Sequence, residues 1–448
     1  MSASTSDGSD PEKGQPRAND VDDHADAVPV SVPGPAAPAS PGHDDIPDGG
    51  TEAWLQVLGS WAILVDTWGL VNTFGVFQAY YERELLSGVS ASDISWVGSL
   101  QGALLMMGGI ISGPLFDAGY FKHELLVGIF LIVLGQFMTS LATKYWHIVI
   151  AQGVCIGLGC GLTFLPSTAI LSQYFHRRRA FVMGIASTGS PLAGMLFPIA
   201  FARLEPSIGF GWTCRVIAFI LLALSIVPAV FMHARTPPSG QMRSLVDMSA
   251  FKDASFCFIM AGSFFGFLTL YVAFFYIQVF AVRHSIGPEH FAPYFVTILN
   301  AGSIPGRVVP NYLADKLGAL NVMLAVLFSS AVVMWGWIGI TNFAGLVVFA
   351  LLYGLFSGGV VSMTPTVVVK LTTDMSRVGT RMGMLMFASG TTLLIGTPIA
   401  GAILGDFSRA RWLATIGYGA AGLTMSVVCF GAAKVVLVRK LGAGASWK

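Results

Sequence analysis

The sequence predicts an all-α membrane protein in which twelve transmembrane helices form two parallel six-helix repeats. Three observations support this fold class: the composition, a series of apolar runs of spanning length, and a set of matches between the two halves of the chain. The 448 residues are 54% hydrophobic and 11% charged, with a mean hydropathy of +0.70. A soluble domain contains about 25% charged residues, so this composition indicates an integral membrane protein.

Twelve apolar runs follow one another along the chain, and each is long enough to cross a bilayer. A spanning helix needs about 20 predominantly apolar residues. The predicted spans are residues 54–80, 94–114, 124–143, 147–173, 180–202, 212–233, 254–282, 291–313, 320–341, 344–369, 382–404 and 412–437. Most connections between them are short. The longest polar connection, residues 234–253, separates the sixth span from the seventh.

The two halves of the chain share short motifs at a nearly constant offset, which is the signature of an internal repeat. The matches are Leu115-Phe116-Asp117 with Leu313-Ala314-Asp315 at an offset of 198, Met183-Gly184 with Met382-Gly383 at 199, and Pro198 with Pro398 at 200. Three matches in the same order predict two copies in the same orientation. We therefore expect an N-terminal half at 53–233, a linker at 234–253 and a C-terminal half at 254–440.

The two ends of the chain are predicted to be tails. Residues 1–50 contain ten acidic residues, two basic residues and eight prolines, without an apolar run. Such a segment cannot bury enough surface to fold, so residues 1–52 are expected to form a disordered acidic tail. Residues 441–448 are expected to form a short C-terminal tail.

The distribution of Lys and Arg predicts the orientation in the membrane. When both tails are placed on one side, that side collects 17 Lys and Arg residues and the other side collects 7. Positively charged residues are enriched in cytoplasmic loops. We therefore expect both termini in the cytoplasm and a multi-pass protein of the plasma membrane.

Arg307 is the most informative residue in the spans, because a charge at membrane depth is costly and usually faces a bundle interior or a wet cavity. Asn300, Ser303, Arg307 and Asn311 are separated by steps of three, four and four residues. These steps place the four side chains on one face of a helix. Arg307 could hold a substrate carboxylate through a planar, two-pronged contact. The alternative is a structural arginine that pairs with a backbone carbonyl or an acidic neighbour.

Several other function classes are not supported by the sequence. None of the eight histidines lies in the middle of a predicted span or beside a nucleophile or a metal-spaced set of carboxylates. The glycine-rich run at residues 157–162 lies inside an apolar helix and follows no strand, so it is not a nucleotide loop. We expect no enzymatic activity, no cofactor, no metal and no nucleic-acid partner. Without an ATP-binding loop, the driving energy must come from a gradient.

Several motifs resemble those of a known transporter family. Residues 113–122 resemble the loop motif between helices 2 and 3 of the major facilitator superfamily, whose members are built from parallel six-helix repeats. Residues 174–180, followed by residues 183–190, resemble the helix 4–5 signature of the monocarboxylate porter family. Three further segments resemble the fungal branch of that family; they are residues 68–78, residues 300–307 and residues 378–383.

The resemblance covers about residues 54–440 and implies secondary transport of small organic anions, often together with a proton. Animal members of the family use a lysine in helix 1 and an aspartate–arginine pair in helix 8. In this sequence Arg307 occupies the arginine position, Ser303 the aspartate position and Asn72 the lysine position. The resemblance therefore implies an anion-binding arginine and leaves lactate-type proton coupling open. Asn300, Ser303, Arg307 and Asn72 are candidate substrate-binding residues.

Asp66 is the only carboxylate near the middle of the first span, and it is the candidate for proton coupling. A lone buried carboxylate favours its protonated form unless a cation lies near it. In one hypothesis Asp66 pairs with Arg307 across the two halves and titrates as substrate binds. In the other, Asp66 faces a vestibule or a neighbouring polar group and only shapes the packing.

The seventh span is crowded with aromatic residues, and Tyr271, Phe275 and Gln278 form a stripe at helical spacing. An apolar cavity with a few polar groups suits a bulky, partly apolar ligand. Tyr271 and Gln278 are therefore further candidates for substrate binding. The alternative for the aromatic residues is lipid contact.

Charged residues at the predicted cytoplasmic loops are candidates for gating ion pairs that stabilise one conformation. The candidates are Asp117, Lys122, Arg178, Asp315 and Arg381. The alternative is that these residues only anchor the loops on the cytoplasmic side.

Three functions stay open. The first is a secondary active transporter that moves a small organic anion or related metabolite by alternating access, with or without a proton. The second is an efflux pump for a fungal secondary metabolite, which the crowded aromatic residues, Ser303 and Asn72 favour. The third is a transporter-like receptor. In each case the expected partners are a small molecule and the lipid bilayer.

Overall fold

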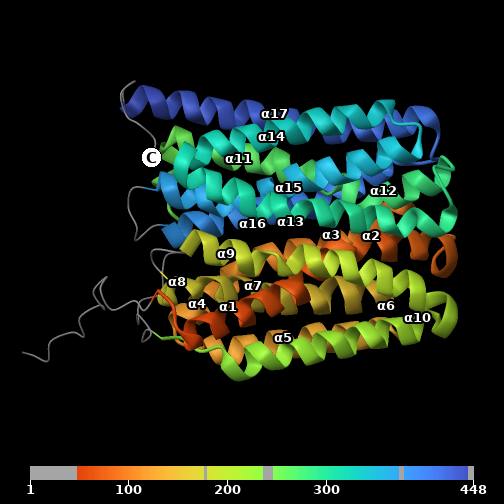
Figure 1. Ribbon diagram of the computed structural model, residues 1–448, viewed down its shortest axis with the longest axis horizontal. Coiled ribbons are helices and arrows are strands. Elements are labelled where there is room, and N and C mark those ends of the chain that lie inside the picture. The colour runs from red at the N-terminus through yellow and green to blue at the C-terminus, as the bar shows by residue number, and fades with distance from the viewer. Residues whose placement is uncertain (1–47, 176–178, 236–245, 373–377, 442–448) are drawn as a thin grey trace, which may run out of the picture. The chain divides into compact units, whose positions relative to one another are not determined.

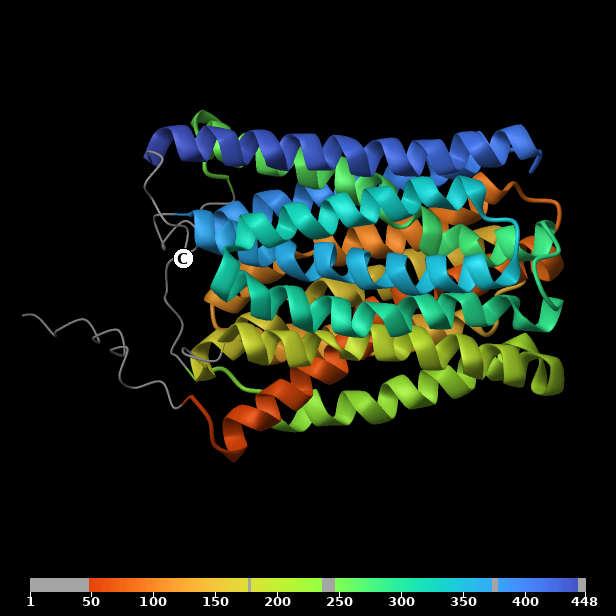
Figure 2. The same ribbon diagram turned by 45° about the horizontal axis from the view of Figure 1, so that its top comes forward.

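The computed structural model describes residues 48–175, 179–235, 246–372 and 378–441. Within these ranges every regular element is a helix (Figure 1). The helices run side by side along the long axis of the bundle, as the turned view also shows (Figure 2). This arrangement confirms the predicted all-α membrane fold.

Among the described residues, the first half of the chain forms six long helical segments. The elements are α1 (Thr51–Leu64), η2 (Val65–Gly69), α2 (Leu70–Tyr80) and η3 (Tyr81–Leu85); α3 (Ala91–Met107) and α4 (Gly109–Asp117); α5 (Phe121–Thr139); α6 (Tyr145–Ile148), η4 (Val149–Ile156), α7 (Gly157–Ala169) and α8 (Leu171–Tyr174); and α9 (Arg179–Ser187) and α10 (Gly189–Phe231). Gly209, with a φ of +77°, interrupts α10 and divides it into two arms. Glycine adopts this conformation without the steric cost that a side chain would bring.

The second half forms six further segments. The elements are η5 (Ala250–Lys252), α11 (Ala254–Leu270) and α12 (Val272–Arg283); η6 (Glu289–Phe291) and α13 (Ala292–Leu317); α14 (Ala319–Gly336) and η7 (Trp337–Gly339); α15 (Phe343–Leu371); α16 (Val378–Leu404); and α17 (Arg409–Leu441). Side-chain caps fix several helix starts. Ser90 accepts a hydrogen bond from the Asp93 amide before α3, and Asn342 accepts one from the Gly345 amide before α15.

Ten helices in the described residues are long and apolar enough to span a membrane. One of them, Phe181–Phe231, contains two spans, because Gly209 breaks it. The 26-residue α13 is not among the ten, since its polar residues lower its hydropathy. Each of the twelve predicted spans therefore coincides with a helical segment, and the boundaries differ by a few residues.

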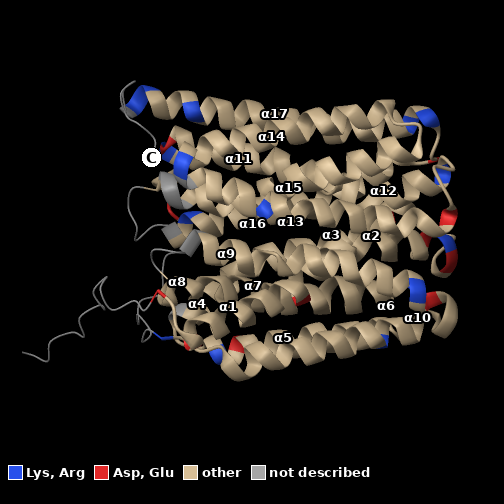
Figure 3. Cartoon of the chain, in the orientation of Figure 1, with Lys and Arg blue, Asp and Glu red and all other residues tan. Residues whose placement is uncertain are grey.

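Charged residues gather at the two ends of the bundle, and the region between the ends is mostly uncharged (Figure 3). The described chain begins and ends at the same end (Figure 1), which we call the terminal end. The opposite end, which carries the connections at residues 86–90, 140–144 and 405–408, is the distal end.

Contacts between the first six and the last six segments follow a reciprocal pattern. The second segment, α3, packs along the eleventh, α16, and the fifth, the first arm of α10, packs along the eighth, α13. In addition, α2 of the first segment packs against α12 of the seventh. These contacts bring α2, α10, α12 and α13 together in the middle of the bundle, where the candidate residues lie.

The position of α13 is fixed by an unusually close approach to α15. A Cβ atom added to Gly302 or Gly306 would overlap a backbone carbonyl of α15, and one added to Gly354 would overlap the carbonyl of Leu299. Small residues let transmembrane helices approach in this way. The backbone of Arg307 is therefore held directly against α15 by its neighbour Gly306.

We expect Gly306→Ala to destabilise the protein by about 1–3 kcal/mol, because the added methyl group must displace the Leu355 backbone. The matched control is Gly417→Ala in α17, where the new Cβ would meet no atom within 4 Å. The thermal unfolding of the detergent-solubilised variants measures the difference. Equal melting temperatures for the two variants would contradict the close packing of α13 on α15.

Candidate functional site

Arg307 lies near the middle of α13 and is 4% exposed. Its Nε atom donates to the Oγ atom of Ser303 at 3.3 Å, and its Nη1 atom donates to the backbone carbonyl of Ser187 at 3.5 Å. Neither partner is charged, and within the described ranges Arg307 forms no ion pair. A buried cation without a counter-ion is costly, so this position favours the arrival of an anion.

The predicted polar face of α13 is confirmed as a set of buried residues. Asn300, Ser303, Arg307 and Asn311 are all buried. The Nδ2 atom of Asn311 donates to the Arg307 carbonyl at 2.7 Å and to the Oγ atom of Ser362 on α15 at 3.0 Å. The polar face thus extends from the middle of the bundle towards the terminal end.

One face of α9 and α10 connects the candidates from different helices. It consists of Ser187, Ser190 and Gly194, whose spacing of three and four residues places them on one side. Arg307 binds the Ser187 carbonyl, as described above. The Nδ2 atom of Asn72 donates to Ser190 Oγ at 3.0 Å, and the Nδ2 atom of Asn300 donates to the Gly194 carbonyl at 3.1 Å. Asn72, Asn300, Ser303 and Arg307 therefore meet around this face.

Two acceptor atoms in this cluster have no hydrogen-bond donor within the described ranges. They are the buried Oδ1 atoms of Asn72 and Asn300. The amide orientation of Asn300 is settled by its two contacts, because the Gly194 and Val296 carbonyls both require a donor. An unpaired buried acceptor costs free energy. It can be satisfied by a water molecule or by a donor group of a ligand.

Aromatic side chains from both halves of the chain surround Tyr271. Its ring stacks on Trp68 with a centroid distance of 6.2 Å and lies 5.3 Å from Phe274. Trp68 lies four residues before Asn72, which binds Ser190 on the same face of α9 and α10 that holds Arg307. Tyr271 therefore lies near the Arg307 cluster.

Gln278 is separated from Tyr271 by two turns of α12. Its side chain is buried, and its Oε1 atom has no hydrogen-bond partner within the described ranges. No described contact connects it with Arg307. The stripe of Tyr271, Phe275 and Gln278 that the sequence predicts is therefore buried, and Tyr271 is the member that stacks on Trp68 near the Arg307 cluster.

Asp66 lies in η2, a π-helical turn in the middle of the first segment, and it is fully buried. Its Oδ2 atom accepts a hydrogen bond of 2.7 Å from Ser225 on the second arm of α10. The hypothesis that Asp66 pairs with Arg307 is wrong for this conformation. The alternative, a neighbouring polar group, is what the structure shows, because η2 turns Asp66 towards α10 within the first half.

The predicted gating residues divide into two groups. The structure does not describe Arg178 or the side chains of Asp117 and Asp315, so these three predictions lie outside the described residues. Lys122 donates to the backbone carbonyls of Ala229 and Met232 at the end of α10. In this conformation it caps a helix end, where a cation is favourable.

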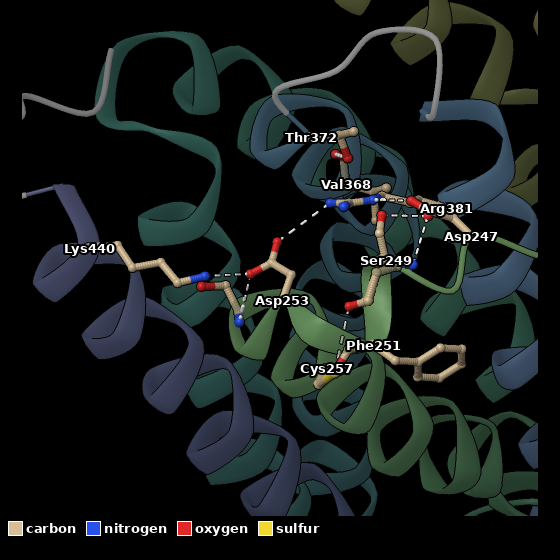
Figure 4. Close-up of polar contacts among 11 residues, drawn as sticks. Asp247, Ser249, Phe251, Asp253, Cys257, Val368, Thr372, Arg381 and Lys440 are labelled. Atoms are coloured by element: carbon tan, nitrogen blue, oxygen red, sulfur yellow. Dashed lines mark hydrogen bonds and ion pairs between the residues drawn. The ribbon is translucent and has the colours of Figure 1, made fainter.

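Arg381 near the start of α16 forms an ion-pair network at the terminal end (Figure 4). Its Nε atom lies 3.2 Å from Asp247, and its Nη1 atom lies 3.5 Å from Asp253, the capping residue of α11. Asp253 also binds Lys440 near the end of α17, at 2.8 Å. The network joins the end of the long linker to three helices of the second half. The sequence predicted a role for Arg381 but not its partners.

The charge state of Asp253 is stabilised by this network. Burial acts to raise the pKa of the Asp253 carboxyl. The hydrogen bond and charge of Lys440, the Ser255 amide and Arg381 outweigh burial and hold the pKa below its ordinary value of 3.8. A depressed pKa means that the stabilisation is present above the ordinary value and is lost as the pH falls through the folded-state pKa. The Asp253 carboxyl is therefore charged at neutral pH.

Replacing Arg381 with alanine is expected to destabilise the protein by about 3 kcal/mol, because the variant loses the buried ion pair with Asp247 and the contact with Asp253. Lys440→Ala is the matched control. Its side chain is half exposed, so its loss is expected to cost less than about 1 kcal/mol. Thermal unfolding at pH 7 measures both variants. The assignment of Arg381 as the centre of the network fails if both variants unfold at the same temperature.

Contacts between the two halves are polar at the distal end. Arg83 pairs with Glu289 at 3.3 Å, and Arg203 donates to the Tyr294 hydroxyl at 3.1 Å. The sequence analysis missed these pairs, because each joins residues that are far apart in the chain. They hold the halves together at this end in the conformation described.

Comparison with known proteins settles the family. The sequence profile of the "Major Facilitator Superfamily" matches residues 53–340. The chain belongs to the Major Facilitator Superfamily. This superfamily assignment agrees with the twelve helical segments and with the buried polar cluster between the first and second halves.

Curated relatives within the superfamily are fungal transport proteins. The chain is 40% identical to "MFS-type transporter dbaD" of Emericella nidulans, over 86% of each chain. It is 37% identical to "Aspyridones efflux protein apdF" of the same species, over 83% of this chain and 75% of the relative. It is 33% identical to "MFS-type transporter pynF" of Aspergillus niger, over 91% of this chain and 93% of the relative. The protein is therefore a multi-pass membrane transporter with a small-molecule substrate, and not an enzyme.

Proposed function

We propose that this protein exports a bulky, largely apolar metabolite that carries an acidic group. In this proposal the metabolite passes from the cytoplasm across the plasma membrane by alternating access, in exchange for protons. The observation that carries the proposal is Arg307, a buried cation that meets only neutral partners and lies beside an aromatic cluster.

The acidic group of the substrate is assigned to Arg307. A guanidinium presents a planar set of donors that matches a carboxylate or a comparable anion. Ser303 orients the guanidinium, and the free Oδ1 atoms of Asn72 and Asn300 would accept hydrogen bonds from a hydroxyl or N–H of the same substrate. The apolar remainder of the substrate would lie against Tyr271 and its aromatic neighbours.

Alternating access would move the N-terminal half, residues 53–233, against the C-terminal half, residues 254–440. The candidates come from both halves, since Asn72 belongs to the first half and Arg307 to the second. The affinity for the substrate would therefore depend on the relative position of the two halves. The proposed halves are supported by the repeat in the sequence and by the reciprocal contacts of α3 with α16 and α10 with α13.

Proton coupling is assigned to Asp66. This carboxyl is fully buried, binds Ser225, and has one oxygen without a hydrogen-bond partner within the described ranges. A carboxylate in such a place is costly in its charged form. A proton would be held here in this conformation and released when the region opens to water. Proton and substrate would then use separate sites.

Export is favoured over uptake by the relatives, one of which is named an efflux protein for aspyridones. The resemblance to the monocarboxylate porter family supports an anion as substrate. It does not support lactate-type coupling, because Ser303 and Asn72 replace the charged residues of the animal members. The excess of Lys and Arg on their side supports a cytoplasmic position for both termini.

The proposal can be tested in yeast cells that express the protein at the plasma membrane. The cells are preloaded with a labelled panel of bulky aromatic acids, or with lactate as the small comparator. We expect faster release of at least one bulky acid than from cells without the protein, and no change for lactate. Faster uptake of lactate, without release of any bulky acid, would instead support a small-carboxylate carrier and contradict the proposal.

A further inference from the structure

Trp68 and Tyr271 form a stacked ring pair across the two halves of the transporter. Their centroids are 6.2 Å apart, and their planes are inclined by 18°. Trp68 belongs to the first segment and Tyr271 to the seventh. Both side chains are buried, with exposed fractions of 3% and 1%. The pair therefore fills the space between the halves in this conformation.

The two rings lie beside the proposed anion site. Trp68 lies four residues before Asn72, and Asn72 and Arg307 bind the same face of α9 and α10. Trp68 also contacts Phe164 in an edge-to-face arrangement, with a centroid distance of 5.8 Å and an interplanar angle of 81°. A flat group held between Trp68 and Tyr271 would thus have a cation at its margin, and Phe164 would hold the indole in place.

Both rings are attached at points where the helix is irregular. Trp68 lies in η2, the π-helical turn between α1 and α2. Tyr271 lies at the junction between α11 and α12. Interruptions of this kind are frequent at functional sites and allow local adjustment without unwinding a whole helix. Both rings therefore lie where the helix departs from regular α-helical geometry.

We infer that Trp68 and Tyr271 bind the flat face of a planar, conjugated ring in the substrate, whose acidic group reaches Arg307. Stacked rings are separated by about 3.5 Å, so a guest between two rings needs about 7 Å. The present centroid distance of 6.2 Å leaves no room for it. In this conformation the two rings stack on each other. A small separation of the halves would open the space between them. This inference rests on the proposed export of an acid and names its substrate class.

A planar ring is favoured over a saturated one for two reasons. A flat guest fits the narrow space that a small separation creates, whereas a saturated ring is thicker. Offset stacking on an aromatic ring also adds attraction beyond the burial of apolar area. With two aromatic faces in contact, we expect about a tenfold preference for the planar acid over its saturated counterpart.

The test uses a matched pair of acids, 2-naphthoate and decahydro-2-naphthoate, and the full-length protein in lipid nanodiscs. Binding of each acid is measured by titration calorimetry for the wild type and for variants. Tyr271→Phe and Trp68→Phe keep a ring, and Tyr271→Leu and Trp68→Leu remove it. Tyr80→Leu is the control, because Tyr80 and Phe210 form another stacked pair, at 4.9 Å and 5°, within the first half.

We expect about tenfold tighter binding of 2-naphthoate to the wild type, a preference that the two phenylalanine variants and Tyr80→Leu retain. For each of the two leucine variants, the dissociation constants of the two acids should differ by no more than about twofold. Equal binding of both acids to the wild type overturns the inference and leaves the proposed function standing, and this comparison needs no variant to fold. If neither acid binds and the cells release no acid of the panel, the proposed function itself is overturned.

Discussion

Replacing Arg307 with alanine is expected to reduce transport of the acidic substrate by about a hundredfold. The loss of hydrogen bonds to a charged group costs about 1.5–3 kcal/mol, and each 1.4 kcal/mol corresponds to about tenfold. The protein should still reach the membrane, because removing a charge from a transmembrane helix makes insertion easier. Release of the acid from preloaded cells, normalised to the amount of protein at the surface, measures the effect.

Two variants act as controls for Arg307→Ala. Arg307→Lys keeps the charge but loses the planar fork, so we expect intermediate transport. Ser303→Ala removes the 3.3 Å contact that orients the guanidinium and keeps the cation, so we expect a smaller loss than with Arg307→Ala. Transport at the wild-type rate in Arg307→Ala would show that this arginine is structural.

Replacing Asp66 with asparagine is expected to abolish the stimulation of transport by a proton gradient. Asparagine has nearly the same shape and can still accept the hydrogen bond from Ser225, but it cannot bind and release a proton. In proteoliposomes, we expect gradient-driven transport to fall by at least about tenfold, which corresponds to 1.4 kcal/mol. Exchange of labelled for unlabelled substrate without a gradient should continue, because this exchange requires no net proton movement.

The control for Asp66→Asn is Ser225→Ala, which removes the hydrogen bond and keeps the titratable group. This variant should shift the pH dependence of transport without removing it. If Asp66→Asn has the same pH profile as the wild type, Asp66 has a packing role only, and the proton must be carried elsewhere.

The helical segments could be predicted from the sequence because the bilayer imposes a simple rule on them. Each span needs an apolar run of sufficient length, and this requirement is local. The rule is less precise where the chain continues as a helix outside the apolar run, as in α10. There the helix extends past residue 202 to the break at Gly209, whose positive φ is a property of the backbone.

The polar face of α13 could also be predicted, because the spacing of Asn300, Ser303 and Arg307 depends only on helical periodicity. The partners of these residues could not. Ser187, Ser190 and Gly194 became recognisable only when α10 was seen beside α13 and α2. Which helix faces which is decided by packing over the whole bundle, and no single segment contains that information.

Asp66 is a second residue whose burial could be predicted from the sequence but whose hydrogen-bond partner could not. Its position in the first span indicated a buried carboxyl, and its partner was left open between Arg307 and a neighbouring polar group. The structure selects Ser225, 159 residues away, because the π-helical turn at residues 65–69 changes the direction of the side chain. A helical wheel with a regular period does not contain such a turn. The sequence does not distinguish Trp68 for a similar reason, since its stacking partner Tyr271 lies in the other half.

The central claim is that Arg307 makes this transporter selective for an anion, and a matched acid and amide test this most directly. Proteoliposomes containing the wild type or Arg307→Gln are loaded with unlabelled 2-naphthoate, and the entry of labelled 2-naphthoate or 2-naphthamide by exchange is measured. The account predicts that the wild type exchanges the acid and not the amide, and that Arg307→Gln no longer exchanges the acid. Entry of the amide at the same rate as the acid, or wild-type exchange of the acid by Arg307→Gln, would contradict it.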